Sequence, residues 1–443
     1  MMRIRISFIF FLLVSQFCAQ AQNWQSVGGP YLTTSLGVRY LKTDTANNQL
    51  LCSAFVGPYQ RLLKYDDANG WDTLGDRIGS GVYQVINYRG NFYSVSCAAP
   101  AGPNNSVGIL VGNQWQLFAE TRQNAFAFYQ HDSDLYAMGT FDSIGGVQAA
   151  QVARYDGTSW NSIGTATFGG GSAVNCALHY QGDLYIGGGF HDTVGNCLAK
   201  WDGQQWTGFG NFFSGGIDAV NCMVEYNGQL YIGGYFTTAS GSPGNFIARW
   251  DGTTWTQVGG GLAGGQLYDM QVYNGELWVC GQITAAGGIA VVGLAKYDGT
   301  DWCNVGTFDN ITTSIEVYNN ELYIGGGFWT VDGDSVTSKV LKCIGGNNTG
   351  ACGHLNTGIE ETANGFSVSV FPNPASTSVT FQMTGEPVTR TVILIDNLGR
   401  EIWRKETNEN TVEYFIDGTA PGLYHYRIED QGTVKFTGKL VIE

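Results

Sequence analysis

Short stretches in which apolar and polar residues alternate, divided by turn residues, recur along most of the chain. In the clearest unit an Asn-Gly pair, whose residues tolerate the positive φ angles of a two-residue hairpin turn, joins the first stretch to the second. No long stretch places apolar residues at i, i+3, i+4 and i+7, so helices are not expected. The pattern predicts an all-β protein whose unit has four strand-length pieces, at residues 219–226, 229–236, 246–251 and from Trp255 onward.

Tryptophan marks the period of this unit, because it opens the fourth piece each time. The tryptophans, 44 to 49 residues apart, are Trp24, Trp71, Trp115, Trp160, Trp206, Trp255 and Trp302. Four antiparallel strands about every 46 residues are typical of one β-propeller blade. Six units are complete, a seventh supplies three strands, and residues 23–28 form a lone fourth strand. We expect a seven-bladed propeller over residues 22–345 that the N-terminal strand closes, with six or eight blades as alternatives.

Adjacent glycines follow Leu-Tyr-Ile in the second strand of three units. Glycine leaves nothing to pack inside a strand, so its recurrence indicates that neighbouring blades approach closely there, while aromatic residues fill the wider space between blades. Phe190, Phe236 and Phe328 follow these glycines and are expected to be buried between blades. If they reach the ring surface instead, beside Tyr235 and Trp329, they would suit sugar stacking or peptide capture.

The N-terminus has the three parts of a secretory signal peptide over residues 1–21: arginines at 3 and 5, an apolar run over 8–14, and a small-residue cleavage site that ends at Ala21. The run is too short to span a bilayer, so no transmembrane helix is expected in the mature chain. Cleavage takes the net charge from −15 to −17. Nucleic acid and anionic lipid are therefore poor partners, whereas a neutral glycan or a protein remains a candidate ligand.

The cysteines give no metal pattern, since neither CxxC nor a Cys/His zinc spacing occurs. Most lie in predicted strands, as buried thiols do. Cys343 and Cys352 form the best candidate disulfide, with Cys303 as a competing partner. No cofactor is predicted. Calcium is the alternative that two acidic loops leave open, but neither completes a calcium-binding loop with its later glutamate, and solvated turn carboxylates are preferred. These loops contain Asp132 with Asp134 and Asp332 with Asp334.

Catalytic motifs are also missing, because the five histidines form no HExxH and no nucleophile elbow is found. Two repeated sets of charged residues have simple interpretations. Aspartates before the last turn of each unit are turn formers: Asp66, Asp156, Asp202, Asp251 and Asp298. Basic residues two positions earlier are spread around the ring by the repeat and make no patch: Lys64, Arg154, Lys200, Arg249, Lys296 and Lys342.

The composition changes after residue 345, where a polar, glycine-rich linker over 346–365 leads to a tail over 366–443. Glycine becomes rarer in the tail and the tryptophan repeat ends. Its alternating stretches predict a small Ig-like β-sandwich. The expected strands are 378–381, 391–395, 412–416 and 423–428.

Two resemblances add to this reading. The repeat resembles that of kelch-like propellers in its Gly-Gly strand, its Tyr-Asp or Trp-Asp pair and its regularly spaced tryptophan. The sequence pattern LYIGGxF…ARWDGxxW is also similar to the repeats of fungal cortical polarity markers. The tail resembles the type A sorting domain of the Bacteroidetes type IX secretion system. The residues that carry this second resemblance are Pro372, Asn373, Pro374, Gly399, Arg400, Pro421, Gly422, Leu423, Tyr424 and Lys439.

The sorting-domain resemblance implies Sec export, passage through the outer-membrane translocon as a partner, and secretion or attachment to the cell surface. Propellers host binding, scaffolding and catalysis alike, so the fold does not choose among these functions. The preferred interpretation is a non-catalytic recognition or adhesion module with no catalytic, cofactor or metal residues. A carbohydrate-active enzyme, hydrolase or lyase, with acids from different blades, and a structural surface protein are the alternatives.

Overall fold

The computed structural model describes the chain in segments, and all structural statements below concern these residues. They are 24–29, 31–32, 35–56, 59–76, 83–95, 106–164, 168, 173–191, 196–209, 218–236, 245–344, 368–371, 375, 377–383, 388–396, 400–430 and 433–442. The predicted signal peptide and linker lie outside them. Two compact units meet in sequence between residues 352 and 353, and every regular element described in either unit is a β-strand, which confirms the all-β prediction.

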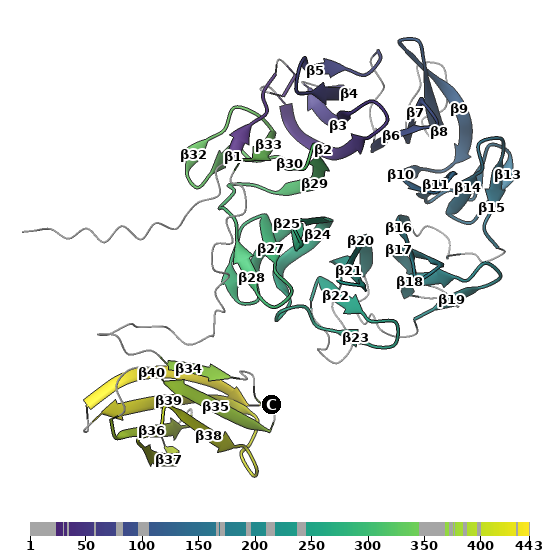
Figure 1. The fold of residues 1–443 in the computed structure, drawn as a ribbon. Coiled ribbons are helices and arrows are strands. Elements are labelled where there is room, and N and C mark those ends of the chain that lie inside the picture. Colours follow the sequence, from purple (N-terminus) through teal and green to yellow (C-terminus); the bar gives the residue numbers. More distant parts are fainter. Residues whose placement is uncertain are drawn as a thin grey trace, which may run out of the picture. The chain divides into compact units, whose positions relative to one another are not determined.

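The first unit is a β-propeller built from sheets of consecutive antiparallel strands that surround a common centre (Figure 1). Seven such sheets lie among the described residues, and we number them as blades in chain order. Blades 1 to 3 contain β2 (Ser35–Asp44), β3 (Gln49–Val56), β4 (Tyr59–Asp66) and β5 (Gly70–Thr73); β6 (Gln84–Tyr88), β7 (Asn91–Val95), β8 (Ser106–Val111) and β9 (Gln114–Arg122); β10 (Ala125–His131), β11 (Asp134–Gly139), β14 (Val152–Tyr155) and β15 (Trp160–Ser162).

Blades 4 to 6 follow the same order of strands. They contain β16 (Val174–Tyr180), β17 (Asp183–His191), β18 (Asn196–Trp201) and β19 (Trp206–Gly208); β20 (Ala219–Tyr226), β21 (Gln229–Tyr235), β22 (Ile247–Trp250) and β23 (Trp255–Thr256); β24 (Leu262–Tyr273), β25 (Glu276–Ala286), β27 (Leu294–Tyr297) and β28 (Trp302–Asn304). Short strands extend the edges: β12 (Ser143–Ile144), β13 (Val147–Gln148), β26 (Ile289–Ala290), β31 (Thr330–Val331) and β32 (Asp334–Ser335).

Blade 7 joins the two ends of the propeller sequence. It takes three strands from the end, β29 (Thr312–Tyr318), β30 (Glu321–Gly326) and β33 (Val340–Cys343), and its fourth from the start, β1 (Trp24–Ser26). β1 pairs with β33 in antiparallel register, with Trp24 opposite Cys343 and Ser26 opposite Leu341. The N-terminal strand therefore covers an edge that would otherwise be open.

Hydrogen bonds between blades explain the repeated aromatic residues. In most blades the tryptophan of the fourth strand donates its Nε1–H to a backbone carbonyl of the preceding blade, although Trp160 does not. These bonds run from Trp71 to Val27, Trp115 to Leu74, Trp206 to Ile163, Trp302 to Val258 and Trp24 to Val305. The tyrosine that ends the first strand donates its hydroxyl to a turn carbonyl of the following blade. These bonds run from Tyr88 to Ser133, Tyr180 to Gly228, Tyr226 to Gly275, Tyr273 to Asn320 and Tyr318 to Asn48.

The paired glycines serve two different contacts. A Cβ on the first glycine, Gly187, would lie 2.6 Å from the side chain of Val220 in the next blade, as the expected close approach of blades requires. A Cβ on the second, Gly188, would lie 1.9 Å from the carbonyl oxygen of Ala173, in its own blade. The first strand has a bulge at this point. The explanation from blade approach is therefore right for the first glycine and wrong for the second.

The repeated charged residues lie as the sequence predicts. Asp251, for example, accepts hydrogen bonds from the backbone nitrogens of Thr253 and Thr254, both at 2.7 Å, and so shapes the turn before β23. The repeated basic residues pair locally within their own blade, as Lys200 does with Asp183 at 2.8 Å. The three phenylalanines after the glycines are buried, as predicted. Cys303, the competing disulfide partner, is disulfide-bonded, and Cys352 lies outside the described residues.

The second unit has two antiparallel sheets with strand orders β34-β35-β38 and β37-β36-β39-β40. Their bounds are β34 (Val368–Phe371), β35 (Ser378–Met383), β36 (Arg390–Ile395), β37 (Glu401–Thr407), β38 (Thr411–Phe415), β39 (Gly422–Asp430) and β40 (Thr433–Ile442). Side chains from both sheets share one core, in which the rings of Phe381 and Tyr426 lie 5.3 Å apart. This is the predicted β-sandwich, and its four predicted strands are β35, β36, β38 and β39.

Candidate binding site in the central pocket

The first strands of all seven blades line one pocket at the centre of the ring, with a volume of about 850 Å³. These strands are β2, β6, β10, β16, β20, β24 and β29. Their residues at one register level would be alike in a perfectly regular propeller, but they differ here. The residues at this level are Tyr40, Gln84, Ala127, Cys176, Cys222, Asp269 and Ser314. The pocket is therefore chemically asymmetric.

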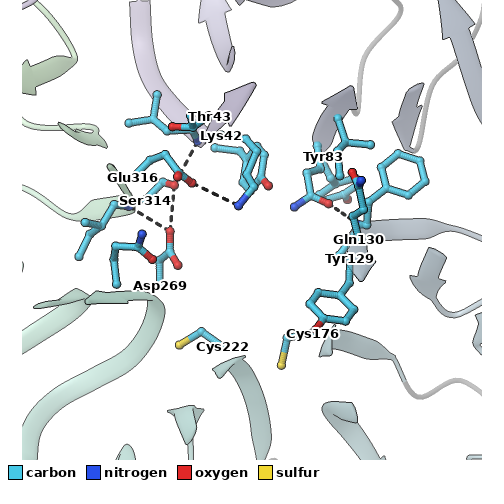
Figure 2. Close-up of a pocket in the computed structure, with 18 of the residues that line it drawn as sticks. Lys42, Thr43, Tyr83, Tyr129, Gln130, Cys176, Cys222, Asp269, Ser314 and Glu316 are labelled. Carbon is cyan, nitrogen blue, oxygen red and sulfur yellow. Dashed lines mark hydrogen bonds and ion pairs between the residues drawn. The ribbon is translucent and has the colours of Figure 1, made fainter. Parts of the chain in front are cut away.

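Blades 6, 7 and 1 form a charged wall (Figure 2). The ammonium of Lys42 lies 3.5 Å from a carboxylate oxygen of Glu316, and the Lys42 side chain is 43% exposed while that of Glu316 is 11% exposed. Glu316 is the largest cause that raises the pKa of Lys42. The chain thus presents a lysine that stays protonated, held against a carboxylate at the pocket wall.

Asp269 lies in the same wall and joins two blades. Its Oδ2 accepts hydrogen bonds from the hydroxyl of Ser314 and from the backbone nitrogen of Ile315, both at 3.0 Å, and its Oδ1 accepts one from the backbone nitrogen of Met270 at 2.9 Å. Burial raises the pKa of Asp269 to about 6, although these donors act in the opposite direction. Ser314 in turn accepts a hydrogen bond from the backbone nitrogen of Leu41, at 3.1 Å, so the network reaches blade 1.

Blades 2 and 3 contribute an aromatic wall to the same pocket, with Tyr83 and Tyr129 (Figure 2). The guanidinium of Arg39 lies 3.7 Å from the centre of the Tyr83 ring, a cation–π distance. The edge of Phe126 meets the same ring at 4.9 Å between centroids. A ligand in this pocket would therefore meet the Lys42–Glu316 ion pair on one wall and aromatic rings, together with the Arg39 guanidinium, on the other.

The two pocket cysteines have a packing role. Burial raises the pKa of the Cys176 and Cys222 thiols, so they are not reactive thiolates. Each sulfur lies over a second-strand glycine: a Cβ on Gly187 or on Gly233 would come within 2.9 Å of it. The thiols therefore fill space that glycine leaves free, as the sequence predicts for buried cysteines.

The acidic loops proposed for calcium have other bonds. Asp134 pairs with Arg154 at 3.3 Å, and Asp332 accepts a hydrogen bond from the backbone nitrogen of Thr307 at 2.7 Å. Within the described ranges no group of three or more His, Cys, Asp and Glu side chains is placed to hold a metal. Of the surface aromatics, Tyr235 is 45% exposed and Trp329 is 50% exposed.

A histidine pair at the seam between blades 3 and 4 is not predicted by any motif of the sequence. The rings of His131 and His179 stack with centroids 3.7 Å apart and planes within 10°. Burial, followed by the charge of His131, lowers the pKa of His179 to about 4, while Asp132 and Asp134 act in the opposite direction. The signal was a departure from the repeat, because histidine stands at 131 where five blades have the bonding tyrosine.

This pair predicts a pH-dependent stability. The unfolded chain binds a proton at His179 near pH 6.5, whereas the folded chain does so near pH 4. The contribution is therefore fully present above about pH 6.5 and is lost as pH falls toward 4. Between pH 6.5 and pH 4 we expect the free energy of unfolding, measured in urea, to fall by roughly 1 kcal/mol. This value already allows for the partial exposure of the His179 ring. His179→Gln should flatten that slope and the exposed-site control His425→Gln should not; equal slopes in both would contradict it.

Comparisons with known proteins identify the family of the second unit. Residues 369–443 match the family model of the secretion system C-terminal sorting domain. The chain therefore carries a type IX sorting domain and is a protein exported to the cell surface or secreted. Among the described residues there is no helix with the length and hydropathy of a membrane span. No curated protein matches the chain.

Solved propeller structures resemble the chain at low identity. PorZ, an essential surface component of the type-IX secretion system of Porphyromonas gingivalis, is 13% identical with a TM-score of 0.44, over 91% of this chain and 59% of its own. The extracellular domain of a hybrid two component system from B. thetaiotaomicron is 12% identical with a TM-score of 0.48, over 95% and 59%. A xyloglucanase from Xanthomonas campestris is 13% identical with a TM-score of 0.46, over 72% and 55%. The chain thus spans about three fifths or less of these proteins, and nothing about activity follows from them.

The described residues of the sorting motif lie in β39 and β40 or close to a strand end of the sandwich. The guanidinium of Arg400 pairs with Asp396 at 2.7 Å, and the hydroxyl of Tyr424 donates to the carbonyl of Ala420 at 2.6 Å. Pro421 and Gly422, which precede Tyr424 in the chain, are exposed. Leu423 and Lys439 lie in β39 and β40. Pro372, Asn373, Pro374 and Gly399 lie outside the described residues.

Proposed function

We propose that the propeller is a non-catalytic recognition module of this exported protein and that it binds a glycan or peptide segment in the central pocket. The observation that carries the proposal is the pairing of two walls: the Lys42–Glu316 ion pair on one side and the Tyr83 ring on the other. Sugar rings and peptide segments carry both hydrogen-bonding groups and flat apolar faces, and so they match such a pocket. Residues 1–21 would direct Sec export, residues 22–345 would bind, and residues 366–443 would engage the translocon.

Two of the carboxylates that line the pocket, Asp269 and Glu316, favour binding over hydrolysis. Both oxygens of Asp269 accept hydrogen bonds from the protein, and Glu316 is paired with Lys42. A glycosidase instead needs one carboxyl group that donates a proton and a second that attacks or activates water. These two carboxylates come from neighbouring blades of one wall, and their present partners serve to hold that wall together.

The rival function is a carbohydrate-active enzyme, which one observation favours. The pKa of Asp269 is raised to about 6 beside Glu316, and an acid poised near neutral pH is what a general acid needs. If the protein is a hydrolase, Asp269→Asn should abolish product release from a bound polysaccharide while binding remains. Product release by the unaltered protein, followed with a reducing-sugar assay, would contradict the recognition proposal.

The direct test is binding of the whole mature chain to a panel of polysaccharides and host glycoproteins, with calcium and with a chelator. We expect saturable binding without product. Lys42→Met should weaken it at least about ten-fold, because it removes a charged hydrogen-bond donor. The matched control is Lys342→Met, since Lys342 belongs to a similar ion pair with Glu321, at 2.9 Å, and does not line the pocket. Equal binding by both variants, or no binding at all, would overturn the central site.

A further inference from the structure

Two of the seven described seams of the ring lack the tyrosine bond that closes the other five. In those seams a tyrosine at the end of the first strand donates its hydroxyl to the turn carbonyl of the next blade, at 2.6 to 3.3 Å. At the seam between blades 1 and 2, Asp44 replaces the tyrosine and accepts hydrogen bonds from Asn87 at 2.9 and 3.0 Å. At the seam between blades 3 and 4, His131 stands at this position by register.

With His131 in place of tyrosine, the turn carbonyl of the next blade has no tyrosine hydroxyl as its donor. Register places Gly182 where the five accepting carbonyls lie in their own blades. Because histidine has no hydroxyl, the Gly182 carbonyl does not receive this bond from blade 3. The ring of His131 instead stacks on His179. The backbone nitrogen of His179 donates to the hydroxyl of Tyr129 at 2.9 Å, which fixes the inner end of the seam.

A cleft of about 380 Å³ lies at this seam. Blade 3 contributes Tyr136 and Arg154 to its lining, and blade 4 contributes His179, Gly182 and Trp201. The Arg154 side chain is 45% exposed, and one of its nitrogens lies 3.3 Å from Asp134. A guanidinium has five N–H donors, so donors remain for a ligand beyond this one contact. The cleft thus combines a carbonyl acceptor, a fixed donor group and aromatic rings.

We propose that this cleft is a second binding site, separate from the central pocket, for a pyranose-sized neutral polyol. A ligand hydroxyl donates to the Gly182 carbonyl in place of the absent tyrosine hydroxyl, and Arg154 donates to a neighbouring ligand oxygen. The partly exposed ring of Trp201, which lines the cleft with the buried Tyr136, supplies the apolar surface against which a sugar ring packs.

The charges of the cleft select a neutral ligand over an anionic one. Asp134 neutralises Arg154, and Asp202 also lines the cleft. The carboxylate of Asp202 is held by the backbone nitrogens of Gln204 and Gln205, both at 2.8 Å, and so remains ionised. Phosphate or carboxylate groups would face two carboxylates and one guanidinium, whereas sugar hydroxyls both donate to carboxylates and accept from the guanidinium.

The test is a titration of the whole mature chain with the methyl glycosides of glucose, galactose, mannose and N-acetylglucosamine, followed by ligand-observed NMR. We expect at least one glycoside to bind saturably in the millimolar range, as a single sugar ring in an open cleft does. Arg154→Met should weaken this binding about ten-fold. Lys200→Met is the matched control, because Lys200 has the same register position in blade 4, pairs with Asp183 and does not line the cleft.

A double substitution that grafts the residues of another seam onto this one provides the decisive test. His131→Tyr together with His179→Val copies the residues of the seam between blades 5 and 6, where Tyr226 and Val272 occupy these positions. The tyrosine hydroxyl should then donate to the Gly182 carbonyl, and glycoside binding at this cleft should fall below detection. The proposal is overturned if no glycoside binds, if the folded graft binds as well as the unaltered chain, or if Arg154→Met and Lys200→Met bind equally.

Discussion

Gly188→Ala is expected to destabilise the propeller by more than about 3 kcal/mol, whereas Gly189→Ala is expected to change its stability by less than about 1 kcal/mol. The two glycines are adjacent in β17, so propensity and position in the chain are matched. A Cβ at Gly188 would lie 1.9 Å from the Ala173 carbonyl oxygen, but at Gly189 the nearest atom, the Ala219 Cβ, lies 3.7 Å away. Only the first change forces the backbone to move.

The backbone at this point has little freedom to adjust. The same Ala173 oxygen accepts a hydrogen bond from the backbone nitrogen of Gly189, at 2.9 Å, and so cannot turn away without loss of that bond. Urea unfolding of both variants measures the difference. An equal midpoint for the two would contradict the steric argument, and a folded Gly188→Ala variant whose blade 4 has lost the bulge would show that the strand can adopt another register.

The glycine pair also shows which contacts the sequence could predict and which it could not. Glycine after Leu-Tyr-Ile predicted a close approach, and Gly187 makes that approach to Val220 of the next blade. The contact of Gly188 is with a bulge in its own first strand, and a bulge adds one residue without changing the apolar pattern around it. Glycine at the second position persists where the first is lost, as in Gly139 and Gly281, whose Cβ atoms would lie 2.1 and 2.3 Å from carbonyl oxygens.

The residues of the central site could not be predicted from the sequence, for a different reason. Leu41 and Ser314 bond to one another across 273 residues of chain, and they meet only because the ring closes. Neither Asp269 nor Glu316 belongs to a motif of short spacing. What the sequence did offer was a comparison of equivalent positions: Asp269 stands where blades 4 and 5 have cysteine. The same comparison would have singled out His131 in place of tyrosine.

The sandwich shows a limit of alternation as a signal. The four strands predicted from alternating apolar residues are present. β37 was missed because most of its side chains are exposed, so its sequence EIWRKET has no buried face to alternate. Such a strand forms because its neighbour β36 is central and supplies hydrogen-bonding partners, with Arg390 opposite Thr407 at one end. That information lies in the pairing of strands.

Trp24→Ala is expected to cost about 3 kcal/mol and to promote association, although the residue lies in a strand of only three residues. Its indole donates to the Val305 carbonyl at 3.1 Å, and its ring meets the edge of Phe308 at 5.9 Å. These contacts hold β1 on β33. Without them blade 7 has three strands, and β33 exposes unpaired backbone groups to other chains.

The neighbouring residue provides the control for ring closure. Gln25 lies opposite Lys342 in the same pairing and is exposed, so Gln25→Ala should leave stability within about 0.5 kcal/mol. Urea unfolding gives the stability and size-exclusion chromatography the association. If Trp24→Ala unfolds at the same midpoint as Gln25→Ala and elutes at the same size, then β33 does not need its N-terminal partner. If instead only Trp24→Ala associates, the pairing of β1 with β33 is what keeps the ring closed, because Gln25→Ala leaves that pairing intact.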